Sequence, residues 1–387
     1  MYPSIFNKVG GIFVHQQVKE LQKQGYEVIV ISPVPLASFP IKYLSKKWKR
    51  YSKIPKKVVL DGIEIYYPRY LTFPKSLFFA SSGKRTYIGV KKTVNEIYKN
   101  FKFDLIHSHV ALPDGYAGML LAKKYKKNLF VTIHGQDFQQ TIYKNKKCKK
   151  YIEKIINFSK KTILVSEKLK NIGINKLNIN PEKLIVIPNG INADDIYKKK
   201  STPLRQYKGG EIILSVSNLT ETKGIDLNLR AIAKSKEKYP NIYYLIIGDG
   251  KERKNLEKLV KELKVKNYVK FLGQIPYNKV MEYMSICDIF SLPSWNEAFG
   301  VVYIEAMAHA KPVIACRGEG IDGIIKDKET GILGKPKDVN SLVGALDFLL
   351  SNPKKAKEIG ERARKLVLKN FTWTRSVQRI IKIYKKN

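Results

Sequence analysis

Short apolar runs alternate with segments of helical periodicity along the whole chain, and this alternation is the feature that most restricts its fold. The runs typical of strands are 27–33, 104–109, 129–135 and 162–166 in the first half, and 211–217, 243–250, 268–273, 288–293 and 312–316 in the second. Segments such as 12–25 and 115–127 lie between them and carry apolar residues at helical spacing. Alternation of this kind predicts an α/β protein, with one parallel sheet covered by helices in each half.

The length of the chain and one polar segment predict its division into domains. A chain of 387 residues exceeds a usual single hydrophobic core. The segment 188–210 is polar and contains Pro and Gly, as connections between domains commonly do. We expect two facing Rossmann-like domains, at 1–190 and 191–370, and a C-terminal helix at 371–387 that packs back toward the first domain.

Polar residues follow the strands in both halves. These polar strand ends are 107–109, 134–137, 217–224, 248–250 and 292–297. Ligands of parallel α/β sheets bind at the carboxyl ends of the strands, and domain interfaces commonly hold them. We therefore expect the functional site in a cleft between the two domains.

The net charge of +39 is extreme and leans toward the first half of the chain. Nucleic acid, an anionic membrane and general solubility are all candidate explanations. No zinc-finger, KH or RRM signature is present, and the lysines are spread through every segment, which disfavours nucleic acid. The segments 46–57 and 143–161 mix clustered lysines with aromatic and aliphatic residues. That composition suits peripheral binding to an anionic membrane, and equally a solvated charged face.

The cysteines and the hydrophobicity of the chain limit further which classes of protein it can belong to. Cys148, Cys287 and Cys316 are scattered, with neither a disulfide framework nor metal-ligand spacing, which fits a reducing cytoplasm. No run approaches the roughly 18 apolar residues of a membrane span, and the first residues do not read as a signal peptide. The hydrophobic content of 44% excludes a disordered chain.

Two glutamates, Glu297 and Glu305, flank Gly300 in the stretch 297-EAFGVVYIE-305. The preceding residues predict a strand that ends in a loop, and the following ones a buried helix that ends before Pro312. A helix start that begins with glycine is a natural anion site, whereas ionised carboxylates accept well from hydroxyl groups. A nucleotide-sugar, with phosphates between two hydroxyl-bearing parts, would satisfy all three features. The alternative is a surface Glu297 and a helix-capping Glu305.

Several longer motifs resemble the retaining glycosyltransferases of the GT-B fold, in family 4. They are 187-IPNGIN-192, 216-VSNLTETKG-224, 246-IIGDGKE-252, 292-LPSWNEAFGVVYIEAMAHAKPVIA-315 and 330-TGIL-333, and the E-x7-E spacing is the signature of that family. The opening 2–25 looks closest to members that build surface polysaccharides or teichuronic-type polymers. The resemblance covers nearly the whole chain.

The resemblance implies a role for each matching residue. Glu297 would contact the donor sugar, Glu305 the ribose, and Lys223 would neutralise phosphate charge, as a compact cation should. His134 would lie beside the transferred sugar. The residues implied to bind the donor are Gly10, Gly11, Asn218, Lys223, Gly273, Ile275, Glu297, Phe299, Gly300, Val301 and Glu305.

Three departures from the family pattern bear on these roles. Asn218 stands where the family usually has Arg, which removes one fixed cation from the phosphate site. The loop 319-EGIDG-323 places Gly323 where the family frequently has Glu. The chain begins at the loop that follows the first strand of the family, a strand that is normally central in the first sheet, and we expect that strand to be missing from the chain as given.

Other interpretations of the single residues remain open. His134, His107 and His109 could be strand-end histidines bonded to neighbours, and Gly10 and Gly11 could simply form a turn. Asp137 is better read as a loop cap than as a base.

The resemblance implies transfer of a sugar, with retention, from a nucleoside diphosphate sugar to a hydroxyl of a glycan or lipid-linked acceptor. No Asp-x-Asp motif is present, so we expect neither a metal nor a cofactor. His134, Glu297 and Lys223 are the candidate catalytic residues. One alternative is a sugar-nucleotide epimerase or a phosphorylase on the same scaffold. A phosphorylase would need a lysine in a pyridoxal-binding context, and none is present. The other alternative is a non-catalytic basic protein that binds nucleic acid or membrane. We expect a cytoplasmic protein, with peripheral contact at the inner face of the membrane as an option.

Overall fold

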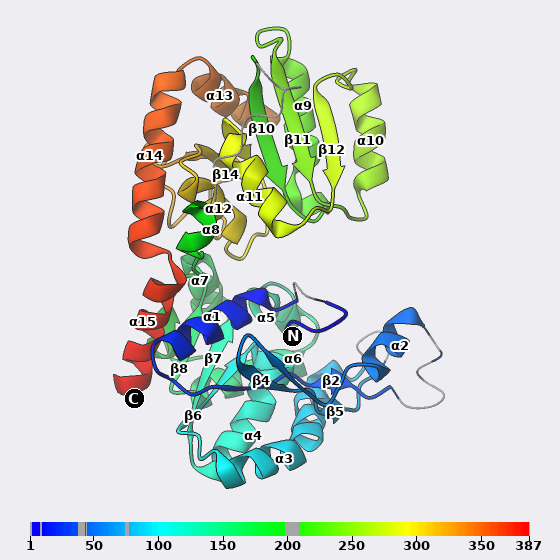
Figure 1. The fold of residues 1–387 in the computed structure, drawn as a ribbon, viewed down its shortest axis with the longest axis vertical. Coiled ribbons are helices and arrows are strands. Elements are labelled where there is room, and N and C mark those ends of the chain that lie inside the picture. Colours follow the sequence, from blue (N-terminus) through cyan, green and yellow to red (C-terminus); the bar gives the residue numbers. More distant parts are fainter. Residues whose placement is uncertain are drawn as a thin grey trace. The chain divides into compact units, whose positions relative to one another are not determined.

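The chain forms two compact units in the computed structural model, which describes residues 2–7, 10–37, 43, 45–73, 77–197 and 209–386. Met1–Ile187 and Ser376–Asn387 make up the first unit, and Pro188–Arg375 the second (Figure 1). Among the described residues, no helix combines the length and the hydrophobicity that are needed to cross a bilayer.

The largest sheet of the first unit is parallel, in the order β6–β7–β8–β9. Its strands are β6 (Leu105–His109), β7 (Asn128–Ile133), β8 (Lys161–Leu164) and β9 (Leu184–Val186). The helices that alternate with them are α3 (Ser82–Asn100), α4 (Tyr116–Tyr125), α5 (Gln136–Gln139), α6 (Lys146–Phe158) and α7 (Glu167–Lys176). Strands β7 and β8 are buried along almost their whole length, as strands covered on both faces should be.

Two smaller sheets complete the first unit. They consist of β1 (Ile29–Ile31), β4 (Ile63–Tyr66) and β3 (Lys57–Leu60), and of β2 (Val34–Pro35) with β5 (Arg69–Tyr70). Strands β3 and β4 form a hairpin whose turn residues Asp61 and Gly62 have φ values of 52° and 76°. Positive φ at both turn residues matches the right-handed twist of a hairpin. Helix α2 (Lys46–Ser52) precedes this hairpin.

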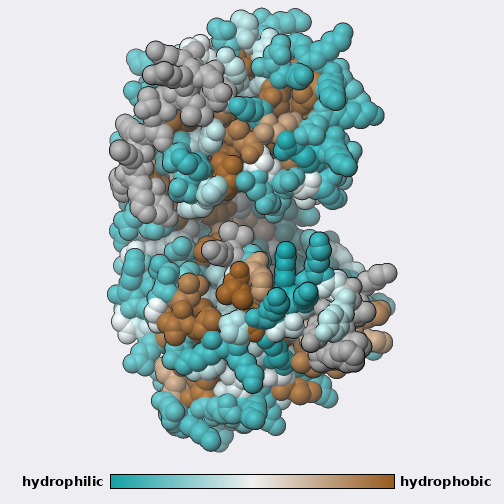
Figure 2. Space-filling model, turned by 45° about the vertical axis from the view of Figure 1, so that its right-hand side comes forward, coloured by the Kyte–Doolittle hydropathy of each residue, from teal (hydrophilic) through white to brown (hydrophobic). Residues whose placement is uncertain are grey.

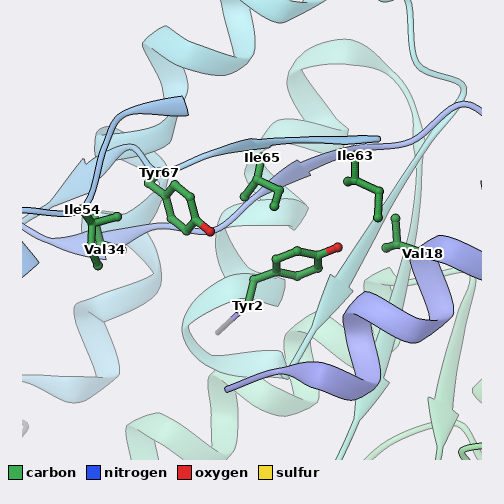
Figure 3. Packing of buried hydrophobic residues seen from close by; sticks show 7 residues of the cluster. All are labelled: Tyr2, Val18, Val34, Ile54, Ile63, Ile65 and Tyr67. Carbon is green, nitrogen blue, oxygen red and sulfur yellow. The ribbon is translucent and has the colours of Figure 1, made fainter. Parts of the chain in front are cut away.

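No strand precedes α1 (Ile12–Lys23) among the described residues, and the start of the chain packs in another way. Tyr2 is buried between β4 and α1, with its hydroxyl 2.8 Å from Nδ1 of His15 (Figure 3). The Tyr67 hydroxyl donates to the carbonyl of Pro3 at 2.6 Å. The apolar side chains around these two tyrosines are Val18, Val34, Ile54, Ile63 and Ile65. The aromatic rings therefore anchor residues 2 and 3 in the core of this unit.

The second unit contains one six-stranded parallel sheet, in the order β12–β11–β10–β13–β14–β15. Its strands are β10 (Glu211–Val216), β11 (Ile242–Ile247), β12 (Val269–Gly273), β13 (Ile289–Ser291), β14 (Val313–Cys316) and β15 (Ile332–Gly334). Its helices are α8 (Ala193–Tyr197), α9 (Ile225–Ser235), α10 (Arg253–Glu262), α11 (Tyr277–Ile286), α12 (Val301–Ala308), α13 (Val339–Leu350) and α14 (Pro353–Asn370). The strand order reverses direction between β10 and β13, which makes this the switch point of the sheet.

The last helix, α15 (Trp373–Lys386), belongs to the first unit from Ser376 onward. Ile380 and Ile383 of this helix pack against the main sheet of the first unit, on Phe130 of β7 and Ile163 of β8. The apolar face of α15 therefore completes a core that the first 187 residues build.

The α/β class with parallel sheets is confirmed, and each of the nine expected strands overlaps an observed one. The short strands β2, β5, β9 and β15 and the hairpin β3–β4 were not expected. These strands have two to four residues each, too short for an alternation of buried and exposed positions to stand out.

Candidate active site

The switch point of the second sheet brings two loops together. The loop 217–224 follows β10 and the loop 292–300 follows β13, and these strands are neighbours. Gly224 has a φ of 66°, and a Cβ on it would lie 2.4 Å from the carbonyl oxygen of Pro293. Glycine is therefore required both for the left-handed backbone and for the contact of the two loops. Ligands of open α/β sheets bind at such a switch point.

A half-buried ion pair joins these loops. Nζ of Lys223 lies 2.5 Å from Oε2 of Glu297, and the two side chains are 24% and 15% exposed. The hydroxyl of Ser294 donates to the same carboxylate oxygen at 3.3 Å. The backbone N–H of Glu297 donates to the carboxylate of Glu319 at 2.6 Å. The surrounding chain thus fixes Glu297 at both its side chain and its backbone.

Helix α12 begins beside this pair. Gly300 precedes it with a φ of 83°, and a Cβ there would lie 2.5 Å from the ring of Tyr303. Phe299 is buried, and Val301 is the first helical residue. The first N–H groups of a helix have no partner within it and carry partial positive charge. The predicted order of loop, glycine and helix is confirmed at this point.

Glu305 lies one turn inside α12. The hydroxyl of Tyr277, at the first residue of α11, donates to its Oε1 at 2.9 Å. Tyr277 is 49% exposed and directly follows the loop 272–276, which contains Ile275. Gly273 ends β12 with a φ of 69°, and a Cβ added to it would meet nothing within 4 Å, so the loop is open on that side. The phenol therefore connects the end of the loop 272–276, which holds two expected donor-binding residues, Gly273 and Ile275, to the expected ribose carboxylate.

Asn218 and Glu319 border the two loops. Asn218 is exposed after β10, and its carbonyl accepts from the backbone of Thr220. Glu319 and Tyr277 contact the two glutamates but were not among the residues expected from the sequence. Glu319 lies in the loop 319–323, whose departure from the family pattern was the only available signal for it.

A stacked row of histidines marks the carboxyl ends of β6 and β7 in the first unit. Nε2 of His134 lies 3.0 Å from Nδ1 of His109, and the rings are nearly parallel with centroids 5.3 Å apart. The ring of His107 stacks on His109 with centroids 4.6 Å apart. The strands are paired in parallel, so their polar ends meet at one edge of the sheet.

Burial keeps this row neutral. It lowers the pKa of His134 to about 4 and that of His107 to about 3, and it holds the pKa of His109 well below its ordinary value. Nδ1 of His134 is buried and has no hydrogen-bond partner among the described residues. A neutral imidazole whose second nitrogen is unpaired can donate to or accept from a hydroxyl group.

The remaining partners of the row come from distant segments. The hydroxyl of Tyr384, on α15, lies 2.6 Å from Nδ1 of His107, and the hydroxyl of Thr132 lies 2.7 Å from Nε2. Both nitrogens of His107 are therefore occupied within the fold. The interpretation of His107 as a histidine bonded to its neighbours is the one that this geometry favours, whereas Nδ1 of His134 is buried without a partner among the described residues.

Asp137 and the two early glycines serve the local fold. The carboxylate of Asp137 accepts from the backbone of Ala111 and Leu112 at 3.0 and 3.1 Å, as a loop cap does. Gly11 caps α1 with a φ of 74°, and the N–H of Gly10 donates to Oδ1 of Asn7 at 2.9 Å. These contacts agree with a turn before α1.

Side chains that could ligate a metal are scattered among the described residues. Within the part of the chain that the structure describes, no group of three or more His, Cys, Asp or Glu side chains could hold a metal ion.

Comparison with known proteins identifies the family. A model of Glycosyltransferase Family 4 matches residues 10–195, and a model of Glycosyl transferases group 1 matches residues 197–366. An uncharacterized glycosyltransferase of Methanocaldococcus jannaschii is 33% identical over 304 residues, which cover 77% of this chain and 80% of that protein. The chain belongs to glycosyltransferase family 4. It is therefore a nucleotide-sugar-dependent glycosyltransferase.

Two other similar proteins extend this comparison. TuaC of Bacillus subtilis, named for teichuronic acid biosynthesis, is 28% identical over 356 residues, which cover 89% of this chain and 86% of TuaC. The structure of a sucrose-phosphate synthase from Thermosynechococcus elongatus superimposes with a TM-score of 0.79 at 22% identity, over 97% of this chain and 93% of the synthase. The structural similarity to the synthase shows that this family 4 glycosyltransferase has the GT-B fold.

Proposed function

We propose that this glycosyltransferase moves a sugar, with retention, from a nucleoside diphosphate sugar to a hydroxyl of a glycan or lipid-linked acceptor in surface polysaccharide synthesis. The observation that carries the proposal is the pair of Lys223 and Glu297 beside the start of α12. A cation, a carboxylate and a helix N-terminus meet there, at the switch point of a parallel sheet. Those groups match a phosphate and a sugar hydroxyl that are joined in one ligand.

The donor would bind in the domain formed by residues 191–370. Its diphosphate would lie against the backbone of Phe299, Gly300 and Val301, where Lys223 adds a full positive charge. The leaving diphosphate gains negative charge as the glycosidic bond breaks. Groups fixed in advance around that charge stabilise the transition state. Lys223 and the start of α12 supply such groups from the chain itself.

The two glutamates would hold opposite ends of the donor. Glu297 would accept from hydroxyls of the transferred sugar once Lys223 turns to the phosphates. Glu305, oriented by the phenol of Tyr277, would accept from the ribose. Gly273 and Ile275 would border the base, and the exposed Asn218 offers an amide where the family usually has a guanidinium.

The domain of residues 1–190, completed by the helix of residues 371–387, would serve the acceptor. The unpaired Nδ1 of His134 supports a contact with a sugar hydroxyl. Gly10 and Gly11 would face the diphosphate, although their present contacts equally suit a turn before α1. The name of TuaC supports an acceptor of the surface-polymer type.

Donor hydrolysis without an acceptor tests the proposal. A retaining glycosyltransferase should slowly release nucleoside diphosphate from its own donor, and a panel of nucleotide-sugars screened by thermal shift identifies that donor, because binding raises stability by mass action. Release of nucleoside diphosphate should be lost in Lys223→Met and kept in Lys258→Met, an exposed lysine of the same domain. An epimerase would instead return an intact isomeric nucleotide-sugar, and a binding protein would release nothing.

A further inference from the structure

Three segments of the first unit are free of acidic residues. Residues 28–60, 65–95 and 138–152 contain no Asp or Glu and together carry 19 Lys and Arg. The chain as a whole has 33 acidic residues, so their absence from 79 residues of one unit concentrates positive charge there. The lysine-rich segments 46–57 and 143–161 overlap the first and third of them.

The fold brings these segments side by side. Strand β2 of the first segment pairs with β5 of the second, beside α2 and α3 (Figure 1). Arg69 of β5 donates to the carbonyl of Ile54, which follows α2. Nζ of Lys144, from the third segment, lies 4.1 Å from the ring centroid of Phe79 in the second. The described parts of the three acid-free segments therefore contact one another.

Five exposed apolar side chains lie in the middle segment, and we call them the apolar patch. They are Leu71 (48% exposed), Phe73 (37%), Leu77 (56%), Phe78 (70%) and Ile88 (64%). Hydrophobic areas of this kind stand out on an otherwise largely hydrophilic surface (Figure 2). In the second unit, by contrast, Tyr277 is the only large hydrophobic residue exposed to this extent among those described.

Arg85 contacts three residues of the apolar patch. Its guanidinium donates to the carbonyls of Leu71 and Phe78 at 3.0 and 3.3 Å and lies 5.0 Å from the ring centroid of Phe73. The rings of Phe73 and Phe78 contact edge to face, with centroids 5.7 Å apart. Phe78 has a φ of 53°, a backbone conformation that is strained for a bulky residue. Strain that leaves an aromatic ring in solvent is typical of a binding surface.

We propose that the apolar patch and the surrounding lysines dock the first unit on an anionic lipid bilayer. The lysines and arginines of the three segments attract acidic headgroups, and the apolar side chains enter the boundary of the acyl chains. Nucleic acid is the weaker partner because the aliphatic side chains of Leu71, Leu77 and Ile88 would gain nothing from phosphates. The inference deepens the proposed function, on which it rests, because a lipid-linked acceptor is presented at such a surface.

Co-sedimentation of the full chain with vesicles tests this docking. Vesicles of phosphatidylcholine with phosphatidylglycerol should bind the protein, and binding should weaken as salt rises. The double variant Leu77→Ser, Phe78→Ser should bind at least roughly tenfold more weakly, since two exposed apolar side chains no longer enter the bilayer. The triple variant Lys84→Gln, Lys91→Gln, Lys92→Gln should also lose binding. Ile174→Ser, which removes an exposed apolar residue outside the three segments, should bind as the parent does.

Three results would overturn the docking model. They are equal binding to neutral and anionic vesicles, equal binding of the double variant and of Ile174→Ser, and capture of duplex DNA that depends on the lysines but not on Leu77 and Phe78. Donor hydrolysis in solution separates this inference from the proposed function. It should be unchanged in the double variant, so a protein that hydrolyses the donor but ignores vesicles contradicts the docking alone.

Discussion

Lys223 and Glu297 form a half-buried ion pair, with 2.5 Å between Nζ and Oε2, although 74 residues separate them in sequence. The chain itself forms the pair, so the lysine is already held at the place where the donor phosphates would arrive. Binding of a diphosphate would offer Lys223 a second and more highly charged partner. The carboxylate of Glu297 would then be free to accept from a sugar hydroxyl.

Lys223→Met should lower turnover while the protein stays folded. The variant keeps the length of the side chain and removes the charge that we propose faces the leaving diphosphate, so we expect a loss of roughly 100-fold in kcat. Lys223→Arg should retain more activity than Lys223→Met, although a planar guanidinium does not reproduce an ammonium. Steady-state kinetics with a saturating donor measures the effect. Equal turnover of Lys223→Met and of the surface control Lys258→Met would remove Lys223 from the mechanism.

Tyr277→Phe should weaken donor binding and spare turnover. The hydroxyl that it removes donates to Oε1 of Glu305, the carboxylate that we propose binds the ribose, away from the bond that breaks. Because the phenol is half-exposed, we expect a modest rise in the KM for the donor, roughly threefold to tenfold. Tyr239→Phe is the matched control, since that hydroxyl donates to the carboxylate of Asp347 at 2.6 Å. A fall in kcat with an unchanged KM would contradict an orienting role.

Gly224→Ala should disrupt the contact of the two loops. The substitution forces a side chain into a left-handed backbone and within 2.4 Å of the Pro293 carbonyl oxygen. Gly209→Ala is the control: Gly209 has a φ of 86°, but an added Cβ would meet nothing within 4 Å. This variant therefore carries only the free-energy cost of the left-handed backbone. Unfolding midpoints in denaturant should therefore fall more for Gly224→Ala, and its affinity for nucleoside diphosphate should also fall. Equal unfolding midpoints for the two variants would contradict this prediction, because the loops 217–224 and 292–300 would then tolerate being pushed apart.

The histidine row should make stability depend on pH. The pKa of His134 is lowered to about 4 by burial, so between that value and about 6.5 the unfolded chain binds a proton that the folded chain does not. The contribution of His134 is thus fully present above about pH 6.5 and is lost as the pH falls toward 4. When the pH falls from 7.5 to 5, the free energy of unfolding of His134→Asn should fall less than that of the parent. Denaturant unfolding at both pH values measures the difference. An identical loss in both proteins would contradict a neutral, buried His134.

The sequence predicted the architecture because its signals are local. Most of the strands that were expected in the two main sheets are short buried runs between helices, and a strand buried on both faces has a continuous apolar sequence. The hairpin β3–β4 also had a local signal, the dipeptide Asp61–Gly62, whose positive φ values the structure shows. It was missed because the apolar run 58–60 of β3 has only three residues, too few to be told apart from a loop by its pattern.

The candidate site could be predicted only in outline. Because ligands bind at the carboxyl ends of parallel strands, the sequence predicted that Lys223 and Glu297 lie near one site. The parallel pairing of β6 with β7 likewise brings His109 and His134 together. The contacts of Tyr277 with Glu305 and of Glu319 with Glu297 depend on loop conformations. Positive φ values at Gly273, Gly300 and Gly318 set those conformations, and no periodic pattern encodes them.

Calorimetric titration of two variants with nucleoside diphosphate tests the central claim most directly. If Glu305 holds the ribose, Glu305→Ala should lose a hydrogen bond to a charged group and bind nucleoside diphosphate roughly 10- to 150-fold more weakly. If Glu297 holds the transferred sugar, Glu297→Ala should bind this sugar-free product as tightly as the parent or more tightly, since Lys223 loses its competing partner. A loss of affinity in Glu297→Ala as large as that in Glu305→Ala would contradict the account.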